Sequence, residues 1–114
     1  MLRLKRAYES PSKDDGKRIL VERLWPRGLT KKEAAIDIWL KEISPSQELR
    51  KWYAHDLKKW SEFRKRYRRE LQENREAVEE LKKLFRKGPV TLIFAARDVK
   101  HSSAIVLRKV LEEK

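Results

Sequence analysis

The sequence has no cysteine, and this absence removes several kinds of chemistry at once. Without thiols the protein has no disulfide, no thiolate nucleophile and no cysteine-ligated metal. Its only imidazoles belong to His55 and His101, and no set of carboxylates accompanies them at the spacing of a metal site. We therefore predict no metal site and no cofactor.

Long apolar runs are also missing. No stretch approaches the roughly 18 consecutive apolar residues that a membrane-spanning helix needs. The amino-terminal segment MLRLKRAYES lacks the apolar core of a signal peptide. We therefore expect a cytoplasmic protein that has no membrane partner. Because a chain of 114 residues can bury one hydrophobic core but not two, residues 1–114 are expected to form a single domain.

Charge, by contrast, is abundant and unbalanced. Lysine and arginine number 30 against 18 acidic residues, which gives a net charge of +12. Such an excess indicates nucleic acid, anionic substrates or non-specific attraction to anions. The abundance of Lys, Arg and Glu, with one methionine and one asparagine, is also typical of proteins from hot environments. That second explanation accounts for the amount of charge but not for its imbalance.

Three segments have the pattern of β-strands. Residues 2–8 alternate apolar and basic side chains, as a strand with one buried face does. Residues 18–24, RILVERL, are more apolar at their centre, and Pro26 with Gly28 should end that strand. Residues 90–96, VTLIFAA, are apolar throughout and predict a central strand covered on both faces. The first two segments either form a hairpin or flank one another in a sheet.

Helical patterns occupy much of the remaining chain. Over residues 59–87 apolar side chains recur three or four positions apart, which predicts a long amphipathic helix. Asn74 interrupts this stripe, so we expect a bend or a polar contact there, and Gly88–Pro89 should end the helix. Shorter helices are predicted after capping residues at Thr30, at Ser46, and at Ser102 or Ser103.

Residues 36–43 are ambiguous, because their apolar side chains fit either a helical stripe or the alternation of a strand. We favour a short helix followed by an extended piece, since Pro45 forces extension on the residue before it. Strands that alternate with helices predict an α/β fold. The expected architecture is a three-layer sandwich with a small, mainly parallel sheet flanked by helices.

Cationic residues gather in RLWPRGLTKK, where the second predicted strand ends. In an open α/β sheet, ligands bind beyond the carboxyl ends of the strands. Arg23 and Arg27 can present planar forks to a phosphate or carboxylate, and Gly28 lets backbone approach a ligand. Lys31 at a helix start opposes the helix dipole, which also suggests a bound anion. With Trp25, these residues are the candidate ligand-binding residues of the loop.

A structural role for the same loop is the alternative. Trp25 would then belong to the core and the Pro26–Gly28 segment would be only a bend. The arginines would pair with acids elsewhere in the fold, for example Asp37, Glu42 or Asp98.

A second group of candidates, in AARDVKHSS, follows the buried strand at residues 90–96. Arg97 is a candidate ligand-binding residue just before a helix whose free amides favour an anion. His101 is a candidate general acid or base, and Asp98 is a second candidate catalytic residue. The structural alternative pairs Arg97 with Asp98 and leaves the histidine exposed. The two groups of candidates lie side by side if their strands are parallel neighbours.

The segment LRKWYAHDLKKW adds Arg50 as a further ligand-binding candidate. His55 and Asp56 resemble an acid/base pair in composition only, because adjacent residues on a helix do not face one another. Asp56 is expected to cap the next helix. The following segment, residues 58–69, holds seven basic residues against Glu62 and either contacts phosphates or forms a solvated helix face.

Three segments, RILVERLWPRGLTK, SPSQELRKWYAHD with Trp60, and VTLIFAARDVKH, resemble the short members of the domain of unknown function 488 family, the YeaO-like proteins. The resemblance implies a compact α/β three-layer domain and a strand within residues 36–43, but no established activity. Two departures are Glu22, where an Asp is usual, and Ser102, where an Asn is usual. Residues that match the family pattern are Arg23, Trp25, Pro26, Arg27, Gly28, Lys31, Trp39, Pro45, Ser46, Leu49, Arg50, Trp52, His55, Asp56, Trp60, Tyr67, Thr91, Ala96, Asp98 and His101.

The leading hypothesis is a cleft that binds a small anionic or nucleotide-like ligand. If the protein is an enzyme, hydrolysis or group transfer at a phosphate-bearing substrate is the simplest reaction, with arginines as charge clamps and His101 as proton carrier. A nucleic-acid-binding accessory protein that uses residues 58–69, and a protein-interaction module, are the alternatives. Oligomeric state is left open. The cleft is expected to be lined by Arg23, Arg27, Arg50, Arg97 and His101.

Overall fold

The computed structural model describes residues 2–113. Within them, β1 (Leu2–Arg6), β2 (Lys17–Leu20), β3 (Ile38–Trp39) and β4 (Val90–Phe94) form one sheet. The strands lie in the order β1-β4-β2-β3, and every neighbouring pair is parallel. The prediction of a small parallel sheet is confirmed. β1 and β2 flank β4 on its two sides and do not form a hairpin.

Strand β4 lies inside the sheet, as its uninterrupted apolar run predicted. All five of its residues are buried. Its register aligns Phe94 with Arg6 of β1 and Ile93 with Leu20 of β2. The strands therefore end together on one side of the sheet. We call this side the carboxyl edge; residues 7–9, 21–28 and 95–101 follow β1, β2 and β4 there.

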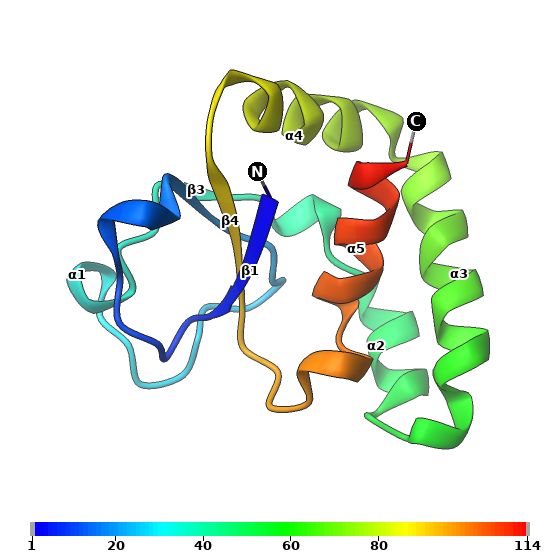
Figure 1. Ribbon diagram of the computed structural model, residues 1–114. Helices are drawn as coiled ribbons and strands as arrows, with labels where there is room; N and C mark the ends of the chain where they lie inside the picture. Colours follow the sequence, from blue (N-terminus) through cyan, green and yellow to red (C-terminus); the bar gives the residue numbers. More distant parts are fainter. Residues whose placement is uncertain (1, 114) are drawn as a thin grey trace.

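Helices cover the two faces of the sheet unequally (Figure 1). One face carries α2 (Gln47–Tyr53), α3 (Trp60–Glu73) and α5 (Ser103–Glu112), with α4 (Arg75–Lys87) crossing one end. The other face carries α1 (Lys31–Ala34) and the chain around it. The molecule is thus an α/β sandwich, as predicted, with a thin third layer. No helix among residues 2–113 has the length and apolar character to cross a membrane.

The helix starts follow the capping residues read from the sequence. Thr30 and Glu33 form a complete capping box at α1. The Ser46 hydroxyl accepts a hydrogen bond from the Leu49 amide at the start of α2. Ser102 is the residue before α5, but its hydroxyl donates instead to the Val99 carbonyl, at 2.9 Å.

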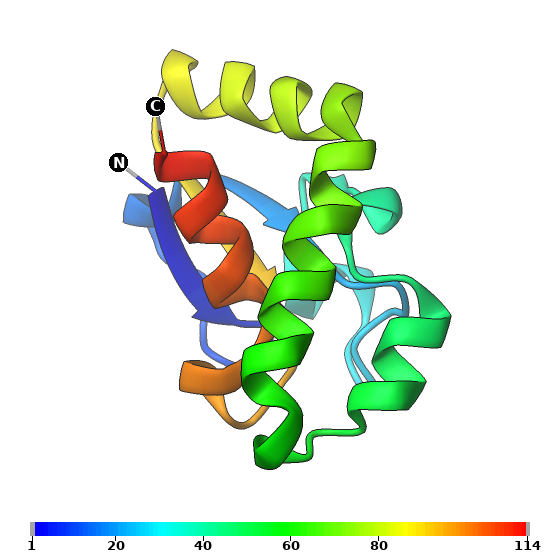
Figure 2. The same ribbon diagram turned by 90° about the vertical axis from the view of Figure 1, so that its right-hand side faces the viewer.

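The long helix predicted over residues 59–87 is two helices. α3 ends at Glu73 and α4 starts at Arg75, and Figure 2 shows α4 turned across the end of α3. The Asn74 side chain donates to the Glu42 carbonyl at 2.8 Å, so the polar contact expected at this residue is present. The apolar stripe nevertheless continues through the turn, because Leu71 and Val78 are both buried in one core.

For residues 36–43 we predicted a short helix followed by an extended piece, and the structure shows the reverse order. β3 comes first and pairs with β2, and the short 3₁₀ helix Lys41–Ile43 follows. The Asp37 amide donates to the Arg18 carbonyl and the Leu40 amide to the Leu20 carbonyl, both at 2.9 Å. Pairing with the open side of β2 satisfies these backbone groups, and tertiary context therefore overrides the local helical stripe.

Candidate functional site

The loop after β2 is shaped by its tryptophans. The Trp25 indole donates to the Leu29 carbonyl at 2.7 Å, and the Trp39 indole donates to the Glu22 carbonyl at the same distance. The two rings meet edge to face, 5.4 Å apart, and pack against the buried cluster that contains Leu20. All of these contacts are internal, so Trp25 fixes the path of the loop.

Arg23 leaves this loop and ties it to the start of α2. Its guanidinium donates to the Pro45 carbonyl at 3.2 Å and to the Ser44 carbonyl at 3.4 Å. Within residues 2–113 no carboxylate lies within 4.0 Å of it. The pairing of Arg23 with an acid such as Asp98, which the structural alternative required, is therefore absent within residues 2–113.

Arg27, Gly28 and Lys31 lie farther along the same loop. Gly28 has a φ of 82°, which favours glycine, and added side-chain atoms would meet open space. Arg27 is exposed, and its carbonyl accepts a hydrogen bond from the Tyr8 hydroxyl at 3.0 Å. Lys31, also exposed, starts α1 in the thin layer. Arg27 is thus anchored to the loop after β1, whereas Arg23 is anchored to α2.

Glu22 is a residue of the carboxyl edge that sequence reasoning did not propose for the site. Burial raises the pKa of its carboxyl group, while a hydrogen bond from the Ala95 amide and the charge of Arg50 act in the opposite direction. Glu22 thus joins the end of β2 to the end of β4 and faces α2. Its place before Arg23, at the end of an apolar run, was the only signal in the sequence.

The two candidate catalytic residues, Asp98 and His101, form a side-chain pair. His101 Nδ1 lies 2.8 Å from Asp98 Oδ2, and the His101 amide donates to Asp98 Oδ1 at 3.2 Å. The bond with His101 lowers the pKa of Asp98. The His101 side chain is 34% exposed, and its ring meets the Trp60 ring edge to face at 5.2 Å. The imidazole is therefore oriented by its neighbours, with Nε2 as its remaining polar atom.

The carboxyl end of α2 lies next to the Asp98–His101 pair. The Tyr53 hydroxyl donates to the His101 carbonyl at 3.1 Å. Burial raises the pKa of Tyr53, and the charges of Asp98 and Asp56 raise it further. His55 follows with a φ of 57°, and its ring lies against Tyr53 with 5.8 Å between ring centres. These contacts place the end of α2 beside the Asp98–His101 pair.

Arg97 does not pair with Asp98, contrary to the structural alternative raised from the sequence. It is exposed, and no acid among residues 2–113 lies within 4.0 Å of it. Arg6, which was not among the candidates, also contacts the loop that follows β4. Its guanidinium donates to the Ala96 and Ala95 carbonyls at 3.0 and 3.3 Å.

The candidates therefore divide into two groups. The expected side-by-side arrangement of the two strand ends is confirmed by the β2–β4 pairing. Around these ends lie the residues that we call the carboxyl-edge cluster: Glu22, Arg23, Arg50, Arg97, Asp98 and His101. Trp25, Arg27, Gly28 and Lys31 belong to the loop that leads away to α1. Among residues 2–113, no group of three His or acidic side chains is arranged to hold a metal ion.

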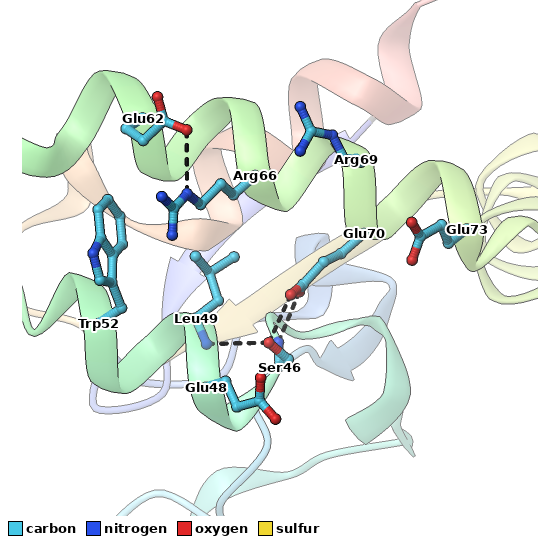
Figure 3. Close-up of a pocket in the computed structure, with 9 residues that line it drawn as sticks. All are labelled: Ser46, Glu48, Leu49, Trp52, Glu62, Arg66, Arg69, Glu70 and Glu73. Atoms are coloured by element: carbon cyan, nitrogen blue, oxygen red, sulfur yellow. Dashed lines mark hydrogen bonds and ion pairs between the residues drawn. The ribbon is translucent and has the colours of Figure 1, made fainter.

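A groove of about 550 Å³ opens elsewhere, between α2 and α3 (Figure 3). Trp52 forms one wall, and the Arg66 guanidinium lies over its ring at 4.1 Å. Glu70 accepts hydrogen bonds from both the amide and the hydroxyl of Ser46, at 2.8 and 2.6 Å. Four glutamates and two arginines line this groove, so it lacks the cationic excess of the carboxyl edge.

Comparison with known proteins places the chain in a family. The family model described as the inactive DUF488-N3 subclade matches residues 1–114. An uncharacterized protein of Mycobacterium tuberculosis (strain ATCC 25618 / H37Rv) is 43% identical over 110 residues, which cover 96% of this chain and 92% of that protein. The uncharacterized protein YeaO of Escherichia coli (strain K12) is 40% identical over 106 residues, 93% of this chain and 92% of YeaO. No solved structure matches. The chain belongs to the domain of unknown function 488 family, within the subclade described as inactive.

Proposed function

We propose that the protein binds a small anionic or nucleotide-like ligand at the carboxyl-edge cluster and does not turn it over. The proposal rests on three arginines of this cluster that have no acidic side chain beside them within residues 2–113. Arg23, Arg50 and Arg97 come from three different segments, and within residues 2–113 none has a carboxylate within 4.0 Å. Guanidinium groups that have no carboxylate beside them and come from separate elements at one edge of the sheet suit a phosphate or carboxylate.

The position of the cluster agrees with the physics of parallel sheets. Ligands of open α/β sheets bind beyond the carboxyl ends of the strands, where loops give way to helices. Glu22 adds an acidic group to the cluster. A carboxylate at the end of a strand can accept hydrogen bonds from sugar hydroxyls, so the mixture of Glu22 with arginines suits a ligand that carries both hydroxyls and phosphate.

Binding without turnover is favoured by the family description and by two departures from the family pattern. The matching family model is described as inactive. Glu22 replaces the usual Asp, and its longer side chain would displace a carboxylate by one methylene. Ser102 replaces the usual Asn, and it is 3% exposed with its hydroxyl bonded to the Val99 carbonyl. With serine at position 102, no side-chain amide follows His101.

A thermal-shift panel tests the proposal. Inorganic phosphate, pyrophosphate, AMP and ATP would be added at matched ionic strength. Ligand at ten times its Kd should stabilise the native state by about 1.4 kcal/mol. Arg50→Ala and Arg97→Ala should remove this stabilisation, whereas Arg86→Ala, at an exposed position of α4, should keep it. If none of the four compounds stabilises the protein, or if Arg86→Ala abolishes the shift equally, the carboxyl edge is not an anion site.

A catalytic role for the same cluster is the second candidate, because the Asp98–His101 bond of 2.8 Å orients an imidazole as acid/base catalysis requires. It predicts slow hydrolysis of a phosphate ester that is lost in His101→Ala, while ligand stabilisation in the panel persists. Equal rates in His101→Ala and the unmodified protein would exclude it.

A further inference from the structure

Half of the protein's net charge is concentrated on one twelve-residue segment. Residues 58–69 contain seven basic residues and one acid, so they contribute +6 of the total of +12. This segment covers the first ten residues of α3, which forms the outer edge of the helical layer (Figures 1 and 2). A charge imbalance of this size is not needed for the fold, because like charges repel one another along the helix.

The structure separates the cations of α3 by what they contact. Arg66 pairs with Glu62 at 3.1 Å and Arg68 pairs with Glu113, and both pairs are exposed. Arg64 lies over the Trp60 ring, 5.7 Å from its centre. Lys65 and Arg69 are exposed, and within residues 2–113 neither has an acid within 4.0 Å.

The unpaired cations form a line. Lys65 and Arg69 are four residues apart, so they share one face of α3 and are separated by about 6 Å along its axis. Arg64 and Arg68 form a parallel row beside them, on the side of α5. No acid lies between the two rows, where the helix surface carries Ser61 and Gln72. Glu62 and Glu73 border the other side of the Lys65–Arg69 row, and Glu62 is paired with Arg66. Such rows of arginine and lysine match the repeated phosphates of a nucleic-acid strand.

We propose that this face of α3, which we call the α3 basic face (Arg64, Lys65, Arg68 and Arg69), binds the phosphate backbone of nucleic acid without reading its sequence. Four of the seven cations in the segment are arginines, whose planar forks suit phosphate oxygens. Nothing on the face has the spacing of a base-reading helix. The contacts are therefore electrostatic and independent of sequence.

A membrane surface is a weaker fit for the same charges. Peripheral helices that enter a bilayer present large apolar side chains next to their cations. The exposed large apolar residues among residues 2–113 are Tyr8, Leu24, Leu57 and Val99, and none of them lies within α3. The apolar side chains of α3 itself, such as Phe63 and Tyr67, are buried in the core.

The test is equilibrium binding of a fluorescein-labelled single strand and a duplex of mixed sequence, across 20–300 mM NaCl. Four to six phosphate contacts should give a slope of log Kobs against log[salt] of about −3 to −5. Lys65→Glu with Arg69→Glu should weaken binding at least tenfold at the lowest salt. The same double variant should also make the slope shallower by about 1.4 to 1.8. Thermal unfolding checks that it is folded.

Lys83→Glu with Arg86→Glu is the matched control, because it makes the same change of charge at exposed positions of α4. It should weaken binding by less than threefold. Equal loss in the two double variants would overturn the proposal, since only net charge would then matter. Binding to vesicles that contain 30% phosphatidylserine, with no binding to either nucleic acid, would also overturn it.

This proposal is independent of the ligand proposed at the carboxyl edge. Arg50→Ala should leave nucleic-acid binding unchanged, and the variant at Lys65 and Arg69 should keep any thermal shift with pyrophosphate. Each proposal can therefore fail while the other stands.

Discussion

Arginines at the two ends of the sheet have different surroundings. At the amino end, Arg18 is 4% exposed and donates to Asp15 Oδ2 at 2.6 Å and to the Ala34 carbonyl at 2.9 Å. Asp15 is 3% exposed, and both of its carboxylate oxygens also lie 3.2 Å from Lys5 Nζ. Every charge in this network has an internal partner of the opposite sign.

At the carboxyl end, no carboxylate of residues 2–113 lies within 4.0 Å of Arg23, Arg50 or Arg97. Arg23 is held only by backbone carbonyls, and Arg50 and Arg97 are exposed. Arginine is therefore bonded to a buried carboxylate at one end of the sheet and has no adjacent carboxylate at the other. The internal ion pairs and the proposed ligand site thus lie at opposite ends of one small sheet, and substitutions at each end should separate their effects.

Breaking the amino-end network should have the largest effect on stability. Asp15→Asn leaves the Arg18 guanidinium buried without a counter-charge, which should lower the free energy of unfolding by about 3–5 kcal/mol. Asp14→Asn, at the exposed neighbouring acid, is the control and should change it by less than about 0.5 kcal/mol. Urea denaturation at pH 7 measures both. Similar values for the two variants would contradict the structural role of the network.

The same network should make the protein sensitive to acid. Burial alone would raise the pKa of Asp15, but hydrogen bonds from the Ser12 amide, Arg18 and Lys5 outweigh it and hold the pKa below its ordinary value. A carboxylate with a depressed folded-state pKa stabilises the fold above its unfolded pKa, and this stabilisation is lost as pH falls through the folded value. Between pH 5 and pH 2 the unfolding free energy of Asp15→Asn should therefore fall less steeply than that of the unmodified protein.

The turn beside the network should be nearly as intolerant. Gly16 has a φ of 63°, and a Cβ there would lie 2.2 Å from the Pro89 carbonyl oxygen. Gly16→Ala combines backbone strain with a clash against backbone, so a loss of roughly 2–4 kcal/mol is expected. Gly28→Ala, at the carboxyl edge, has φ strain but open space, and should cost about 1–2 kcal/mol. If calorimetry gave equal losses of unfolding free energy for the two variants, this would contradict the close approach of Gly16 to Pro89.

Arg23 is the intermediate case, because it has both a structural contact and an unneutralised charge. Arg23→Ala removes a half-buried guanidinium together with its two hydrogen bonds to backbone carbonyls. This should lower the free energy of unfolding by about 1–2 kcal/mol. Arg27→Ala, in the same loop but exposed, should stay within about 0.5 kcal/mol. Chemical denaturation of both variants, followed by tryptophan fluorescence, measures the difference. A neutral Arg23→Ala would mean that its carbonyl contacts add nothing to the fold.

The smallest change in stability is expected for Arg50→Ala and Arg97→Ala, within about 0.5 kcal/mol of the unmodified protein. These substitutions should nevertheless abolish any stabilisation by phosphate compounds. Loss of ligand response without loss of stability is the opposite of the outcome predicted for Asp15. A marked destabilisation by Arg50→Ala would instead make it a structural residue and remove the contrast between the two ends.

The fold was largely predictable because its signals are local. The apolar run of β4 and the buried stripe of α3 depend on residues close together in sequence, and the capping box at Thr30 is complete within four residues. For residues 36–43 the local pattern predicted a helix first, whereas the family resemblance implied the strand that is observed. The local pattern failed because the deciding interaction is with β2, some twenty residues away. A local pattern contains no information about which strand has an open side.

The candidate site was predictable only in part. Its position followed from the rule for parallel sheets, but the pairing of Asp98 with His101 was not predicted, because the sequence suggested Arg97 as the partner of Asp98. The partner of Arg23 was not predicted either, because backbone carbonyls at residues 44 and 45 leave no mark in the side-chain sequence. Glu22 was missed for a similar reason, since its contact with the Ala95 amide depends on the strand order.

An NMR titration of ¹⁵N-labelled protein with pyrophosphate, at constant ionic strength, tests the contrast between the two ends most directly. We predict saturable shifts at the amides of residues 22, 23 and 95–98 and at the Arg50 side-chain Nε–H, with no change at residues 15–18. Shifts confined to α3, equal shifts at both ends of the sheet, or no saturable shift would contradict the account.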